Sequence, residues 1–130
     1  MNEKKNLTIK ETFTLAVQNH QKNNLKIAEN LYKEILKTNP NHASAHSNLG
    51  LIFYAFGEFQ KAISSYQKAI EINPNYADAH NNLGVVLNEL GEHQKAISCY
   101  EKAIQINPNH VEAHNNLGVV LNELGEHQKA

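Results

Sequence analysis

Apolar and small residues recur along this chain at steps of three and four positions, the spacing that places side chains on one face of an α-helix. From about position 77 to 90, that face consists of Ala77, His80, Leu83, Gly84, Leu87 and Leu90. From about 93 to 106, a second face consists of Ala96, Ile97, Tyr100, Ala103 and Ile104. Gly91 between them can adopt the positive φ that ends a helix, and Pro108 lacks the backbone donor needed for the second helix to continue. The pattern therefore predicts two helices joined by a short turn.

The same pattern repeats every 34 residues. This step separates the prolines, the Leu-Gly pairs, the turn glycines and the tyrosines: Pro40, Pro74 and Pro108; Leu49-Gly50, Leu83-Gly84 and Leu117-Gly118; Gly57, Gly91 and Gly125; Tyr32, Tyr66 and Tyr100. The stretch from Ala79 to Ala96 recurs letter for letter from Ala113 to Ala130. The shared period predicts repeat units at 9–42 (divergent), 43–76, 77–110 and 111–130 (truncated), after a disordered tail at 1–8.

Small residues predict how the two helices of a unit meet. Gly84 and Ala96 carry little side chain, so the helices can approach closely while Tyr100 fills the flanking space. Replacing Gly84 with Leu is expected to wedge the pair apart, at a cost of roughly 1–3 kcal/mol or more.

The ends of the helices carry their own signals. Asn23 stands where later units have Gly57, and asparagine is the next-best residue for a left-handed turn. An asparagine followed three residues later by an acid predicts a capping box at the start of a helix, as in Asn75 with Asp78 and Asn109 with Glu112.

The period, together with Leu83-Gly84, Gly91, Ala96, Tyr100, Ala103 and Pro108, resembles the tetratricopeptide repeat over residues 9 to 130. The resemblance implies an all-α fold, an α-solenoid in which antiparallel helix-turn-helix units stack into a right-handed superhelix. It also implies a protein-protein interaction scaffold, because the first helices of such units line a concave groove that binds a peptide or protein partner. Carried onto this chain, the expected contacts are Asn48, Leu51, Tyr54, Asn81, Asn82, Val85, Asn88, Asn115, Asn116, Val119 and Asn122.

Three of these asparagines, Asn48, Asn82 and Asn116, occupy the same position in successive units. A carboxamide can both donate and accept, so such a column can pair with the backbone of a peptide without reading its side chains. The arrangement resembles the asparagine ladder in the repeats of O-linked N-acetylglucosamine transferases. The alternative is that these amides are solvated or join one unit to the next.

Charge and composition narrow the partner. Twelve basic and thirteen acidic residues give a net charge of −1, without the basic excess typical of nucleic-acid binders. The lysines and arginine that clamp chaperone carboxylates in other tetratricopeptide proteins are replaced by Asn, Val and Glu. An amide-rich, mildly acidic groove therefore predicts neutral or basic ligands. No signal peptide or membrane-spanning segment is evident, so we expect no membrane partner and a cytoplasmic location.

Catalytic and metal chemistry is not expected. The pairs His42 with His46 and His110 with His114 have helical spacing, but nothing completes a ligand set and Tyr76 interrupts the series. Cys99 aligns with a serine and lacks a partnered base in its own unit. No phosphate-binding loop or serine elbow is present, so the chain is predicted to be neither an enzyme nor the holder of a cofactor.

The last unit stops soon after its first helix, which is expected to leave Leu117, Val120, Leu121 and Leu124 without a covering helix. We expect either a fragment of a longer protein or self-association through this end. The first unit resembles the opening of bacterial proteins in which such repeats precede a transferase domain. An alternative function is therefore a substrate-recruiting arm of a glycosyltransferase or sulfotransferase.

Overall fold

A computed structural model describes residues 7–128, with side chains to residue 125. In this range the chain forms seven helices and no strand: α1 (Ile9–Gln21), α2 (Leu25–Thr38), α3 (Ala43–Ala55), α4 (Phe59–Ile72), α5 (Ala77–Glu89), α6 (His93–Ile106) and α7 (Val111–Gln128). Most of the predicted tail, residues 1–6, lies outside the described range. Thr8 is the N-cap of α1, in a capping box with Glu11, so the first unit begins before position 9.

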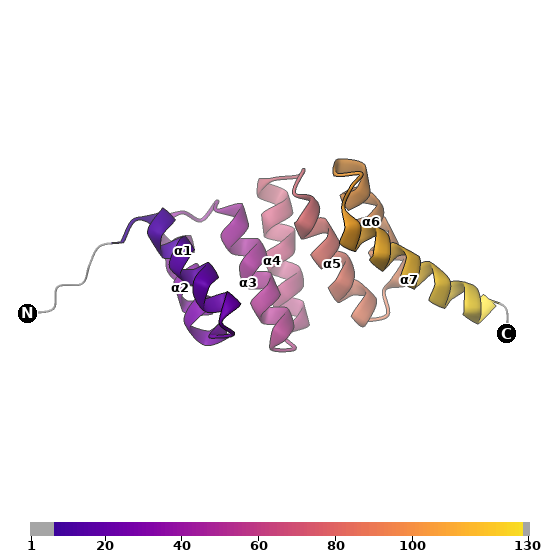
Figure 1. The fold of residues 1–130 in the computed structure, drawn as a ribbon, viewed down its shortest axis with the longest axis horizontal. Helices are drawn as coiled ribbons and strands as arrows, with labels where there is room; N and C mark the ends of the chain where they lie inside the picture. The colour runs from indigo at the N-terminus through magenta and orange to yellow at the C-terminus, as the bar shows by residue number, and fades with distance from the viewer. Residues whose placement is uncertain (1–6, 129–130) are drawn as a thin grey trace, which may run out of the picture.

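The helices stand side by side in a row from α1 to α7 (Figure 1). The pairs α1–α2, α3–α4 and α5–α6 are joined by short turns, and each second helix also packs on the first helix of the next pair. Contacts also join α3 to α5 and α5 to α7, so successive first helices meet on one side of the row. The predicted all-α solenoid of helix-turn-helix units is confirmed.

The turns within the pairs depend on backbone at positive φ. Gly57 has φ 75° and Gly91 has φ 81°, and Asn23 takes the same conformation with φ 64° in the first pair. This confirms that asparagine substitutes for glycine at the divergent turn. Asparagine tolerates the left-handed region better than most residues because its short polar side chain can hydrogen-bond locally.

In the α3–α4 and α5–α6 hairpins, a glycine of the first helix lies beneath a tyrosine ring of the second. A Cβ placed on Gly84 would lie 2.6 Å from Cε1 of Tyr100, and one on Gly50 would lie 2.6 Å from Cε1 of Tyr66. Both tyrosines are buried, and so are the alanines at 28, 62 and 96 where the second helices pack. The predicted close approach at Gly84 is confirmed.

The predicted capping boxes at Asn75 and Asn109 are wrong. Each of these residues donates its backbone N–H to the side chain of the asparagine two positions earlier, and α5 begins at Ala77 after Tyr76. The cap of α7 is His110, whose Nδ1 accepts the backbone N–H of Ala113 at 3.1 Å. Each helix is capped one residue later than predicted, so Asp78 and Glu112 stand at the second helical position and not at the third, where a capping box needs the acid.

The last helix differs from two expectations. Val120 is 1% exposed and packs with Ala96 and Tyr100 of α6, and Leu117 and Leu124 join the same cluster. Of the four residues expected to lose their cover, Leu121 is exposed, at 50%. The helix also continues through Gly125 to Gln128, although Gly91 ends α5 in an identical local sequence.

Candidate functional site

A cleft of about 230 Å³ opens where three successive first helices meet. Its walls come from α3, from the start and middle of α5, and from the first turn of α7, through Ser47, Asn48, Leu51, Tyr76, Asp78, Asn82 and Glu112. Larger hollows of about 370, 480 and 570 Å³ lie elsewhere, beside α1, at the turns near Asn23 and Phe56, and between α2, α3 and α4. We concentrate on the smaller cleft because it joins three units and is lined mainly by polar groups.

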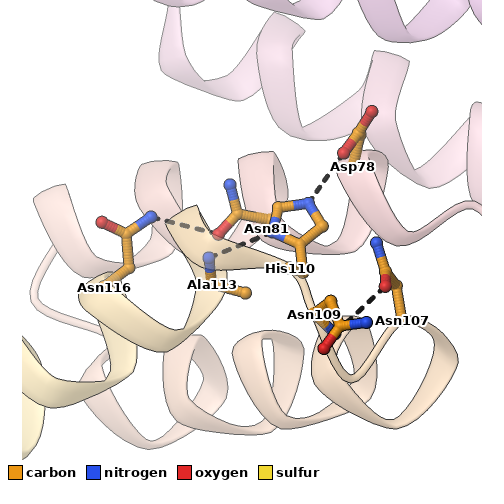
Figure 2. Close-up of polar contacts among 7 residues, drawn as sticks. All are labelled: Asp78, Asn81, Asn107, Asn109, His110, Ala113 and Asn116. Carbon is orange, nitrogen blue, oxygen red and sulfur yellow. Dashed lines mark hydrogen bonds and ion pairs between the residues drawn. The ribbon is translucent and has the colours of Figure 1, made fainter.

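The asparagine column is used differently in each unit. The amide of Asn48 donates to the hydroxyl of Tyr32 at 3.2 Å. The amide of Asn116 donates to Oδ1 of Asn81 at 3.0 Å, as Figure 2 shows. Asn82 makes no hydrogen bond to another described side chain, and it lines the cleft. Two members of the column therefore have structural partners, and the middle one is available to a ligand.

The residue that stands opposite the asparagine column differs from one pair of units to the next. Between α5 and α7 this position is Asn81, which is 2% exposed and accepts from Asn116. Between α3 and α5 the corresponding position is Ser47, also 2% exposed, and no hydrogen bond joins it to Asn82. Because the serine side chain is shorter than that of asparagine, Ser47 does not pair with Asn82, and both residues line the cleft.

The other predicted contacts fall into three groups. Asn81 is buried between units, which removes it from the partner surface on which it was expected. Tyr54 and Asn88 are part-buried and have partners, since Tyr54 donates to Oε1 of Glu89 at 3.0 Å and Asn88 lies 2.7 Å from Nδ1 of His93. Leu51 and Val85 are half-buried, whereas Asn115, Val119 and Asn122 are exposed.

A histidine–carboxylate pair at the edge of the cleft was not predicted. Nε2 of His110, on the turn before α7, lies 2.7 Å from Oδ1 of Asp78 on α5 (Figure 2). Because Nδ1 already accepts from Ala113, the ring proton is assigned to Nε2, which donates to the carboxylate. Aligning the repeats could have suggested the contact, since Tyr76 one unit earlier reaches the hydroxyl of Ser44 at 3.4 Å.

The charges that line the cleft are negative. Asp78 and Glu112 are its ionisable acids, and no lysine belongs to its lining. The lysine–glutamate ion pairs of the described residues lie along the second helices or at their N-caps: Lys26 and Lys33 with Glu29, Lys61 with Glu58, Lys68 with Glu71, and Lys95 with Glu92. These lysines therefore do not neutralise the cleft.

The side chains that could suggest catalysis, such as Cys99 and Tyr54, are part-buried and have raised pKa values. Burial raises the pKa of the Cys99 thiol to about 11, so the sulfur is protonated at neutral pH and a poor nucleophile. Burial, followed by the hydrogen bond to Glu89, raises the pKa of Tyr54. Within residues 7–128, with side chains described to residue 125, no group of three or more described histidine, cysteine or acidic side chains has the geometry to hold a metal ion. In the same range, no helix is both long and apolar enough to cross a membrane.

Family models match three overlapping segments of the chain. A model described as "TPR repeat" covers residues 50–91, and two described as "Tetratricopeptide repeat" cover 77–110 and 99–130. A search of curated protein sequences found no match.

Solved structures match over most of the chain. The crystal structure of MamA is 31% identical, with a TM-score of 0.83 over 91% of this chain and 69% of that one. The O-GlcNAc transferase of Thermobaculum terrenum is 26% identical, with a TM-score of 0.85 over 93% of this chain but 23% of that one. The first TPR of Spaghetti (RPAP3), solved with an HSP90 peptide, has a TM-score of 0.85 at 20% identity, covering 90% of this chain and 93% of that one. The helical repeats, the glycine–tyrosine packing and these matches agree, and the chain belongs to the tetratricopeptide repeat family.

Proposed function

We propose that this chain is a protein-interaction scaffold that holds an extended peptide segment of a partner along α3, α5 and α7. The observation that carries the proposal is the cleft in which Asn82 lies without a partner while Asn48 and Asn116 are occupied. A carboxamide in this position can donate to a peptide carbonyl and accept from a peptide N–H. Asn82 is therefore the central backbone contact, and Leu51 beside it supplies an apolar surface.

The charge of the cleft restricts the class of peptide. The related fold of Spaghetti (RPAP3) binds an HSP90 peptide, SRMEEVD, which is rich in acids near its end. In this chain Asp78 and Glu112 would repel such a sequence, and no lysine of the cleft lining compensates. The proposal therefore predicts neutral or basic peptides as ligands.

The proposal is tested with a defined library of short peptides and three single variants. Asn82→Ala should weaken peptide binding by about three- to tenfold, the net value of one or two hydrogen bonds. Asn30→Ala is the matched control, because this exposed asparagine lies on the second helix α2 and does not line the cleft. Asn116→Ala should lower the stability of the array, because its amide joins α7 to α5.

Fluorescence anisotropy with labelled peptides measures the affinities, and circular dichroism checks that each variant folds. Peptide binding that is equal in the native chain and in Asn82→Ala would contradict the proposed site. Failure of every peptide pool to bind would contradict the proposed function.

A second candidate function is the substrate-recruiting arm of a larger transferase. It is favoured by the 26% identity to the Thermobaculum terrenum O-GlcNAc transferase, of which this chain covers 23%. In that case the same cleft would hold the polypeptide to be modified, and the catalytic groups would lie in another domain. Sequencing the gene beyond the codon for Ala130 tests it directly, since a frame that closes without a transferase domain would exclude it.

A further inference from the structure

The cleft between α3, α5 and α7 holds more hydrogen-bond acceptors than donors. One of the two amide N–H groups of Asn48 is donated to Tyr32, which leaves the other N–H and the acceptor Oδ1. Asp78 uses Oδ1 to accept from His110, which leaves Oδ2, and Glu112 makes no ion pair with another described residue. Asn82 adds a carbonyl oxygen that no described hydrogen bond uses. The residues that carry these oxygens come from three helices and line the same cleft.

Ser47 provides an independent sign that the cleft is built for a ligand. The residue is 2% exposed and lines the cleft, and its hydroxyl makes no hydrogen bond to another described residue. Among the described residues no fully enclosed polar side-chain atom lacks a partner, so this oxygen is reached through the cleft. A bound N–H donor can reach this oxygen through the cleft and take the place of water there.

We propose that the cleft binds an arginine side chain of the partner peptide; this inference rests on the proposed function and names the residue class that the site selects. A guanidinium carries five N–H donors and no acceptor, which complements a cavity lined by carboxylate, carbonyl and hydroxyl oxygens. Leu51 forms an apolar wall against which the methylene stem can pack. The volume of about 230 Å³ is below the range of about 300–1,000 Å³ for whole small molecules, and suits one long side chain.

Arginine fits better than the other charged side chains. Lysine has the right charge but offers three donors from a single point, so it cannot reach acceptors spread over three helices at once. An acidic side chain would meet Asp78 and Glu112 with the same charge and would leave the oxygens of the cleft without donors. A neutral amide would satisfy fewer acceptors and gain no charge attraction.

His110 positions one of the acidic groups without cancelling its charge. Its ring is 7% exposed and is fixed at both nitrogens, by the backbone N–H of Ala113 and by the carboxylate of Asp78. In this tautomer the ring is neutral, so Asp78 keeps its negative charge while one oxygen is held in place. The second oxygen is left for the ligand.

The test uses the full chain and four pools of short peptides that differ at one fixed position, which carries arginine, citrulline, lysine or glutamate among randomised uncharged residues. Citrulline has the shape of arginine without its charge, so the arginine-to-citrulline ratio isolates the proposed contact. We expect the arginine pool to bind at least about tenfold more tightly than the citrulline pool, as charge-assisted hydrogen bonds imply. The lysine pool should fall between them, and the glutamate pool should bind most weakly.

Three variants locate the selectivity. Asp78→Asn and Glu112→Gln preserve shape and remove charge, and each should reduce the arginine-to-citrulline ratio. Ser47→Asn should remove the selectivity by restoring the pair seen between Asn81 and Asn116, thereby filling the cleft. Circular dichroism confirms that each variant is folded.

The outcomes separate the two proposals. If arginine and citrulline pools bind equally and binding still depends on Asn82, the arginine site is refuted and the peptide scaffold stands. If arginine is preferred but Asp78→Asn, Glu112→Gln and Ser47→Asn all keep the preference, the site has been misplaced and the inference fails. If no pool binds, the proposed function itself fails.

Discussion

Replacing Gly84 with alanine adds one methyl group where α5 packs against the Tyr100 ring of α6. The new Cβ would lie 2.6, 2.9 and 3.1 Å from Cε1, Cδ1 and Cζ of the Tyr100 ring. Because Tyr100 is 2% exposed, its ring cannot swing into solvent, and the helices must separate or the ring must leave its rotamer. Overpacking of this kind costs about 1–3 kcal/mol.

The chain contains its own control for the backbone effect. Gly118 stands in the same local sequence on α7, but a Cβ there would meet nothing within 4 Å. Alanine is favoured over glycine inside a helix by about 0.8–1.0 kcal/mol, and this gain applies to both positions. Gly118→Ala should therefore stabilise the chain by about 1 kcal/mol, while Gly84→Ala should destabilise it by up to about 2 kcal/mol.

Urea unfolding followed by far-ultraviolet circular dichroism measures both variants under the same conditions. The difference between their free energies of unfolding cancels the helix-propensity gain and leaves the overpacking cost of about 1–3 kcal/mol. Equal stabilisation by the two substitutions would refute the reasoning, because it would show that Tyr100 accommodates the methyl group without cost. Ala16, fully buried at the corresponding position of α1, shows that a hairpin whose surroundings differ can accept alanine there.

Three further predictions concern a turn, a cap and an ion pair. Gly91 has φ 81°, so Gly91→Ala should destabilise the chain by about 1–2 kcal/mol, while Asn23→Gly, at φ 64°, should be neutral or stabilising. Chemical denaturation measures both variants, and an equal loss of stability would contradict the assignment of Asn23 as the residue that replaces the turn glycine. His110→Ala should lower the stability of the chain by about 1–2 kcal/mol, because it removes the cap of α7 and the contact with Asp78. Hydrogen exchange should show the loss of protection first in α7, and unchanged protection in α7 would exclude the capping role of His110. The pKa of Glu29 is lowered from 4.5, chiefly by its hydrogen bond to Lys33, so the stabilisation from this pair is present above pH 4.5 and is lost as the pH falls through the lowered pKa. Glu29→Gln should therefore flatten the dependence of the melting temperature on pH in that acidic window, and an unchanged slope would contradict the pairing.

Much of the fold followed from local patterns. The spacing of apolar residues and the positions of glycine and proline predicted the helix pair at 77–106 to within about a residue, because the apolar periodicity and the turn glycine act within a few positions of the chain. The site was less predictable. The sequence placed the column Asn48, Asn82 and Asn116 on one surface, but not which member would remain available, because that depends on the residue opposite each amide in the neighbouring unit.

The two identical stretches, 79–96 and 113–130, separate what the sequence determines from what the tertiary structure decides. In the first, Gly91 turns the chain at positive φ, and Asn81 is buried; in the second, the helix passes through Gly125, and Asn115 is exposed. Local sequence determined that both stretches begin as helices with the same apolar face. The chain turns at Gly91 because α6 folds back against α5, and Asn81 is buried because the next unit stacks on α5. The turn costs conformational entropy and the burial costs desolvation, and local contacts alone do not offset either cost.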